Sequence, residues 1–120
     1  MFVALLMVGC GSPDLDDKET LESIHAEAID GDKLQKRGEK GEELYYAPNQ
    51  QTSYTGWAKW MYDNGQISYL NQYIDGKADG LQTEWYKNGQ KRRERTYKDG
   101  ELMTIVDWKP SGEKFPEPKL

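Results

Sequence analysis

The stretch GWAKWMYDNGQ at residues 56–66 recurs as GLQTEWYKNGQ at residues 80–90, a constant offset of 24 residues. Each copy continues into a second short signature, YIDG at residues 73–76 and YKDG at residues 97–100. A fixed period of this length is typical of repeat arrays, in which each unit packs on its neighbours. The sequence therefore predicts a repeat architecture for the second half of the chain.

Four turn dipeptides punctuate the two copies and predict where strands reverse. Asn-Gly is the strongest short hairpin signal, because a type I′ turn needs positive φ at both central residues. Asp-Gly pairs predict the alternate turns. We therefore expect a mainly β fold, with antiparallel β-hairpin repeats in an elongated, twisted meander sheet. The predicted turn residues are Asn64, Gly65, Asp75, Gly76, Asn88, Gly89, Asp99 and Gly100.

A two-residue loop at the second Asn-Gly pair also predicts the strand register. Cross-strand partners share a face of the sheet. The register would place Trp85 opposite Arg92, Glu84 opposite Arg93 and Gln82 opposite Arg95. One face would then carry Gln82, Glu84, Tyr86, Lys91, Arg93 and Arg95. Neither face is purely apolar, which favours a single sheet over a closed sandwich.

Degenerate copies flank the two clear ones. Upstream, the pattern predicts strands near residues 34–37 and 43–47, separated by a glycine-rich turn. Downstream, residues 105–113 start a third copy, in which Pro110 marks an edge because proline cannot donate to a ladder. We assign residues 33–115 to the β-hairpin repeat domain and residues 116–120 to a disordered tail.

The N-terminal residues predict a cellular location rather than a folded element. Residues 1–9 are apolar but too short to span a bilayer, which needs roughly 20 residues, and they match a signal-peptide core. Cys10 follows Gly9 as in a bacterial lipobox, so we expect a lipidated protein of the cell envelope, anchored at the outer membrane. The alternative is a buried apolar strand with a free thiol.

Residues 10–32 are expected to form an acidic tether. They follow an abrupt change to polar sequence and include a possible short helix within residues 19–29, or a strand at residues 26–29. Residues 11–32 hold eight acidic residues and one basic residue, within a net charge of −5 for the chain. The nearly neutral remainder disfavours nucleic acid as a partner. His25, the single histidine, has no metal-ligating neighbours in the sequence.

The recurring Tyr-x-Asn-Gly-Gln followed by Tyr-x-Asp-Gly resembles MORN-type repeats, in the bacterial variant of YwqK-family antitoxin proteins. The run LYYAPN at residues 44–49 with YTGW at residues 54–57 is similar to the segment that leads into the first repeat there. The resemblance implies β-hairpin repeats and a protein partner, such as a toxin-like protein. The apparent export signal departs from a cytoplasmic antitoxin.

Three classes of function follow. The first is a membrane-tethered, non-catalytic module for protein–protein interaction, since exposed aromatics beside arginines are typical of hot spots. Its predicted contact residues are Trp57, Trp60, Trp85, Arg93 and Arg95. The alternative for the tryptophans is that they only staple successive hairpins.

The second class is an envelope glycan or anionic membrane-surface binder that uses Lys91, Arg93 and Arg95, with binding that weakens in salt. The third, an enzyme, is not expected. The aspartates of the repeats are explained by turn chemistry, and no nucleophile, metal-ligand or phosphate-loop pattern is present in the sequence. We therefore predict no catalytic residue, metal site or cofactor.

Overall fold

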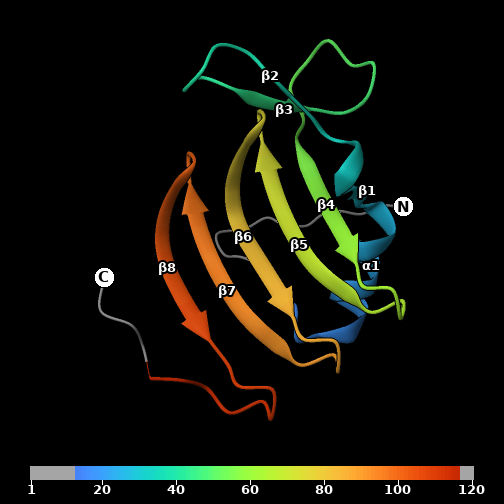
Figure 1. Ribbon diagram of the computed structural model, residues 1–120, viewed down its shortest axis with the longest axis vertical. Helices are drawn as coiled ribbons and strands as arrows, with labels where there is room; N and C mark the ends of the chain where they lie inside the picture. Colours follow the sequence, from blue (N-terminus) through green and yellow to red (C-terminus); the bar gives the residue numbers. More distant parts are fainter. Residues whose placement is uncertain (1–12, 117–120) are drawn as a thin grey trace.

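The computed structural model describes residues 13–116 of the chain. A six-stranded sheet dominates the fold (Figure 1). Cys10 and the predicted signal peptide lie outside the described residues. From β4 to β8, strands that follow one another in the chain are antiparallel neighbours, and β1 pairs with β4 in parallel. The strands are β1 (Ile29–Asp30), β4 (Gly56–Met61), β5 (Ile67–Ile74), β6 (Lys77–Trp85), β7 (Lys91–Lys98) and β8 (Glu101–Asp107). The mainly β, antiparallel prediction is confirmed.

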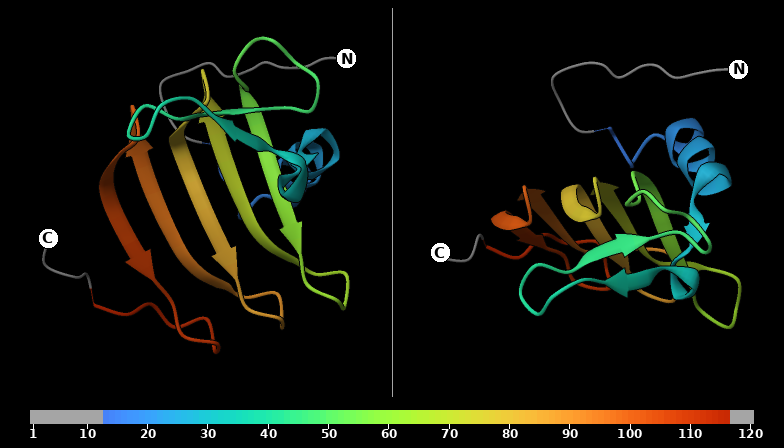
Figure 2. Two further views of the ribbon diagram at one scale, coloured as in Figure 1. Left: turned by 45° about the horizontal axis from the view of Figure 1, so that its top comes forward. Right: turned by 90° about the horizontal axis from the view of Figure 1, so that it is seen from above.

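One helix, α1 (Lys18–Glu27), covers one face of the sheet (Figure 2). Its start is fixed by Asp17, whose side chain accepts a hydrogen bond from the backbone N–H of Thr20 at 3.0 Å. Leu15, just before the helix, is only 5% exposed and belongs to the core beneath it. The helix prediction is confirmed, but the acidic segment is no simple tether, because from Leu15 onward it packs on the sheet.

The core lies between α1 and the sheet. Along β6 it is built by alternate side chains, as the pleat of a strand requires. On β5, the bulge opposite Trp60 and Met61 brings Ile67 and Leu70, three residues apart, into the same core. Leu21 and Ile24 of the helix pack against it, together with Trp57 from β4. The buried members are Leu15, Ala28, Ile67, Leu70, Leu81 and Trp85.

A second, two-stranded sheet lies on the other face, near one end (Figure 2). Its strands β2 (Gln35–Arg37) and β3 (Leu44–Tyr46) fall where the degenerate upstream copy was expected. They do not join the main sheet; Tyr45 packs on Tyr73 of β5 instead, with ring centroids 5.2 Å apart. The short helix η2 (Gly31–Lys33) links β1 to this hairpin. The principal extents are 43 × 37 × 33 Å, so the expected elongation is not observed.

The Asn-Gly turns are not of the expected type I′. Asn64 does not have positive φ, whereas Gly65 has a φ of +86° and donates its N–H to the carbonyl of Tyr62 at 3.0 Å. This is a type I turn followed by a left-handed glycine, a three-residue loop. The type I′ turns are the Asp-Gly ones, since Asp75 and Gly76 have φ of 50° and 84°. Their partners 24 residues later have matching conformations.

The longer loop changes the register next to it. Glu84 pairs with Arg93 and Gln82 with Arg95, as predicted, but Trp85 pairs with Lys91 instead of Arg92. A β-bulge at this point absorbs the extra residue. The same irregularity recurs in the preceding hairpin, between Trp60 and Met61. The error therefore follows from assuming a two-residue loop.

Hydrogen bonds clip neighbouring turns together at the period of the sequence. Tyr62 donates its hydroxyl to the carbonyl of Trp85 at 2.6 Å, and Tyr86 donates to the carbonyl of Trp108 at 2.8 Å. At the opposite tips, Gly76 donates its N–H to Tyr54 at 2.8 Å, and 24 residues later Gly100 donates to Ala78 at 3.0 Å. Each hairpin is thus fixed to its neighbour at both ends.

Candidate binding site

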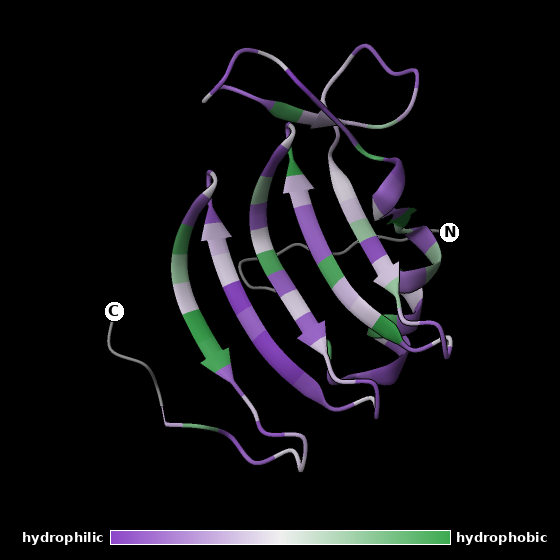
Figure 3. Ribbon diagram, viewed as in Figure 1, coloured by the Kyte–Doolittle hydropathy of each residue, from purple (hydrophilic) through white to green (hydrophobic). Residues whose placement is uncertain are grey.

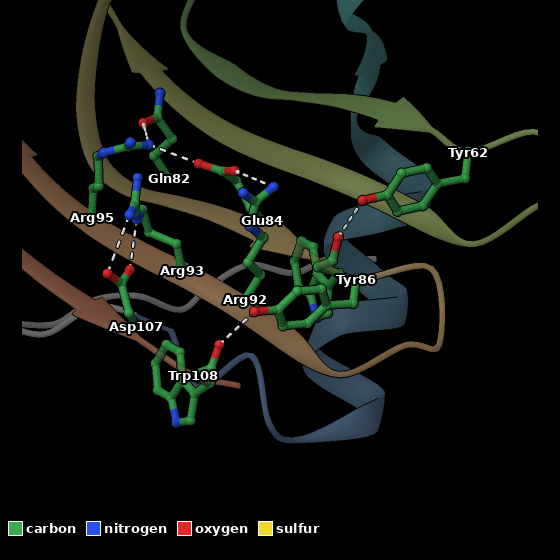
Figure 4. A network of polar contacts seen from close by, with 10 residues as sticks. Tyr62, Gln82, Glu84, Tyr86, Arg92, Arg93, Arg95, Asp107 and Trp108 are labelled. Atoms are coloured by element: carbon green, nitrogen blue, oxygen red, sulfur yellow. Dashed lines mark hydrogen bonds and ion pairs between the residues drawn. The ribbon is translucent and has the colours of Figure 1, made fainter. Parts of the chain in front are cut away.

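Polar side chains gather on the face of β6, β7 and β8 that points away from α1 (Figure 4). Gln82 and Glu84 alternate along β6 with the buried Leu81, Thr83 and Trp85, which face the helix. We call this surface the arginine face. It consists of Gln82, Glu84, Arg92, Arg93, Arg95 and Asp107.

Two of the three arginines of this face form hydrogen bonds with carboxylates of the protein itself. Arg93 grips the carboxylate of Asp107 with two hydrogen bonds, of 2.6 Å from Nε and 3.2 Å from Nη2. Arg95 donates to Glu84 at 2.8 Å and to Gln82 at 3.0 Å. Such charge-assisted pairs fix the orientation of a guanidinium. Hydrogen bonding to Arg93 lowers the pKa of Asp107, so this carboxylate is held ionised.

Arg92 differs from its two neighbours. The bulge places it on the arginine face, where its Nη1 lies 3.9 Å from Glu84, beyond hydrogen-bonding distance. Its side chain is 56% exposed, compared with 38% for Arg93 and 21% for Arg95. The guanidinium lies 5.8 Å from the ring centroid of Tyr86, within cation–π range. Arg92 therefore keeps hydrogen-bond donors directed at solvent.

A shallow groove of about 530 Å³ adjoins Arg92. We call it the arginine groove. Phe115, 41% exposed, and Pro116 contribute apolar surface, while the Arg93–Asp107 pair contributes a fixed polar one. The lining residues are Tyr86, Arg92, Arg93, Asp107, Trp108, Phe115 and Pro116. Arginine, tyrosine and phenylalanine together are the side chains enriched where proteins bind proteins.

The tryptophans predicted to contact a partner have structural roles. Trp85 is only 4% exposed, beneath α1, so the expectation of a surface residue is wrong. Trp57 packs against the same core. Trp60 lies against Gly31, donates its Nε1–H to Asp32 at 3.1 Å and packs on a tyrosine of β5. The structure thus brings Arg93 and Arg95 together and separates both from the predicted tryptophans.

Lys91 is also not where the sequence placed it. The bulge turns its side chain to the helix face, where it pairs with Asp16 at 3.2 Å and Glu94 at 3.3 Å. Its Nζ also lies 5.3 Å from the ring centroid of Trp108. The predicted Lys91–Arg93–Arg95 cluster therefore does not form. Lys91 instead fastens the N-terminal segment to β7.

His25 lies in the last turn of α1. Its carbonyl accepts a hydrogen bond from the ammonium of Lys59 at 2.8 Å, which ties the end of the helix to β4. Burial, and then the charge of Lys59, lower the pKa of the His25 imidazole. No cluster of potential metal ligands occurs among residues 13–116.

Sequence reasoning missed Arg92, Tyr86 and Phe115 as members of a site. Their grouping depends on the bulge and on the third turn, which brings residues 115 and 116 back beside β8. The basic run at residues 91–95 is the one available signal, but alternation alone selects Lys91 in place of Arg92.

Comparisons with known proteins add no relative. No family model matches the chain, and neither the curated proteins nor the solved structures contain a match. In the part of the chain that the structure describes, no helix has the length and apolar character needed to cross a membrane.

Proposed function

We propose that this protein is a non-catalytic protein-interaction module of the MORN-repeat type, similar to YwqK-family antitoxins and held at the bacterial outer membrane by a lipid on Cys10. The period of 24 residues, repeated in turn geometry and in the hydrogen bonds between turns, supports the repeat assignment. The lipobox-like position of the single cysteine supports the anchor. The partner is a protein, and a toxin-like protein fits the resemblance.

The exposure of the Arg92 side chain is the observation on which the binding proposal rests. An exposed guanidinium beside Tyr86 and an apolar groove wall suits a partner segment with a carboxylate next to an apolar side chain. Glu84 and Asp107 serve as counter-ions that orient the other two arginines. These carboxylates therefore have a structural role, and the protein catalyses no reaction.

Binding of anionic headgroups or acidic glycans is the second candidate. Arg92 supports it too, because a solvent-directed cation attracts any anion. Headgroup binding is less well supported because Lys91 lies on the helix face, where it pairs with Asp16. A single exposed arginine gives little of the attraction that several basic residues together provide at an anionic surface.

The test is affinity capture from detergent-solubilised envelope with the lipidated protein and an Arg92→Glu variant. We expect the wild type to recover one stoichiometric protein and the variant to lose it. Lys98→Glu, an exposed charge reversal on the same strand, should behave as wild type. Equal recovery by Arg92→Glu would remove the groove from the proposal. Binding to anionic vesicles that disappears with salt, without a captured protein, would favour the second candidate.

The anchor has its own test. A Cys10→Ser variant should shift from the membrane fraction to the soluble fraction on cell fractionation. Continued membrane association of the variant would contradict lipid anchoring.

A further inference from the structure

The asparagine of each Asn-Gly turn holds the turn that follows it. Asn64 donates its side-chain amide to the carbonyl of Lys87 at 3.2 Å, and Asn88 donates in the same way to Pro110 at 3.0 Å. The side-chain carbonyl of each asparagine accepts the N–H of the glutamine two residues later, at 2.9 Å. Both positions therefore need an amide, because a carboxylate has no hydrogen to donate.

The turn that Asn88 holds, at residues 109–113, positions one wall of the arginine groove. Phe115 lines the groove, follows this turn and donates its N–H to the carbonyl of Asp107 at 2.9 Å. The hydroxyl of Tyr86 and the amide of Asn88 tie the turn and the residue before it to the preceding hairpin. Loss of the Asn88 hydrogen bond would therefore loosen the groove wall.

An asparagine that precedes glycine is also chemically reactive. The backbone nitrogen of Gly89 can attack the side-chain carbonyl carbon of Asn88, because glycine has no side chain to shield it. A carbon–nitrogen bond forms, and the side-chain nitrogen leaves as ammonia with the proton of the glycine N–H. Water then opens the resulting ring at either carbonyl, which gives Asp or its β-linked isomer. Both residues are exposed, so water can reach the ring.

The folded turn slows this reaction without preventing it. Gly89 donates its N–H to the carbonyl of Tyr86 at 3.0 Å, and the Asn88 amide is hydrogen-bonded at both of its polar atoms. Ring closure needs these bonds to break, so it proceeds while the tip of the hairpin is locally open. Within the described residues, a Cβ added to Gly89 would have only the side chain of Gln66 within 4 Å. Close packing over the tip therefore does not resist opening.

We propose that Asn88 is a deamidation site, and that its modification releases the turn at residues 109–113 and weakens binding at the arginine groove. The product carries a carboxylate in place of the donor amide, so this carboxylate and the carbonyl of Pro110 face each other as two acceptors. The β-linked product also lengthens the backbone of the turn. Weaker binding presupposes the interaction function proposed above, whereas release of the turn does not.

Peptide mapping by mass spectrometry tests the modification. The full chain carrying Cys10→Ser is kept at mildly alkaline pH, either folded or in urea. Asn64 and Asn88 should be converted in both samples, and faster in urea. Asn49 is exposed but followed by Gln50, so it is the control and should stay intact. Conversion of Asn88 in urea alone would overturn the site.

Hydrogen exchange tests the release of the turn. In Asn88→Asp, the amides of Gly112 and Phe115, which are hydrogen-bonded in the folded protein, should exchange several-fold faster. In Asn64→Asp these two amides should exchange as in the wild type, and the amide of Gly89 should exchange faster instead. Unchanged exchange of Gly112 and Phe115 in Asn88→Asp would overturn the release.

Affinity capture with the lipidated protein tests the effect on binding. Asn88→Asp should recover several-fold less partner than the wild type. Asn49→Asp adds the same charge in the loop after β3 and should recover as much as the wild type. Equal recovery by Asn88→Asp would overturn the effect on the groove. If the wild type captures no protein, the proposed function and this effect fail together, and mapping and exchange still decide the modification and the release of the turn.

Discussion

Thr83 shows how a single buried group limits stability. It is fully buried on β6, and its hydroxyl has no hydrogen-bond partner within the described protein. An unsatisfied buried hydroxyl costs free energy that an apolar group of the same shape avoids. We therefore expect Thr83→Val to raise the free energy of unfolding by about 1 kcal/mol, measured by urea denaturation. Thr96→Val, at a partly exposed position on β7, should change little, and a destabilised Thr83→Val would contradict the prediction.

Asp107 makes stability depend on pH. Its pKa is lowered from the ordinary 3.8 by the hydrogen bonds from Arg93. A carboxyl with a lowered folded-state pKa stabilises the fold fully above its unfolded pKa, and that stabilisation is lost as pH falls through the folded value. Asp107→Asn should lower the free energy of unfolding at pH 7 and reduce its decline below pH about 4. Asp63→Asn, in a turn, serves as control, and parallel pH profiles for wild type and Asp107→Asn would contradict this reading.

At the scale of the elements, the tyrosine clips hold successive hairpins side by side. Removing one hydroxyl from Tyr62 or Tyr86 leaves the carbonyl of the next turn without its donor. Each change to Phe should cost about 0.5–1.5 kcal/mol in the free energy of unfolding. Tyr46→Phe is the control, since its hydroxyl makes no hydrogen bond to a described residue. Equal melting of all three variants would show that the turns are not coupled through these bonds.

The elements also show how far the sequence predicts the fold. The hairpins, the helix and the pairs of Glu84 with Arg93 and Gln82 with Arg95 were all predicted correctly. The bulge was not, because Asn-Gly suits both a type I′ turn and a type I turn that ends in a left-handed glycine. Contacts between turns decide between them: Asn64 donates its side-chain amide to Lys87 of the next hairpin at 3.2 Å. No local pattern reports such a contact.

The same limit applies to the candidate site. The basic run on β7 was recognised, but a shift of one residue exchanged Lys91 for Arg92 on the arginine face. The tryptophans were ambiguous, since a large aromatic side chain serves a core as well as a surface. Burial resolves that ambiguity, and it depends on where α1 lies.

At the scale of the whole molecule, the segment from Leu15 through α1 belongs to the folded domain. Leu15 is a single leucine among acids, so no periodicity marked it, yet it closes the core beneath α1. Leu15→Ala should lower the free energy of unfolding by about 2–4 kcal/mol, measured by urea denaturation. Ile74→Ala, at a position that is 42% exposed, should cost much less. Equal effects would return this segment to the role of a loose tether.

Because Leu15 is packed in the core, its position determines how a lipid-anchored molecule would be oriented on the membrane. Four residues lie between Cys10 and Leu15, so the five steps from one Cα to the other span at most about 17 Å when fully stretched. The protein is 33 Å across even along its shortest axis. Leu15 packs on the face of the sheet that α1 covers. A lipid on Cys10 would therefore hold the helix toward its own bilayer. Arg92, on the opposite face of the sheet, would point away from the membrane toward the aqueous compartment. It would be accessible to a partner in that compartment and not to the lipid headgroups of the same bilayer.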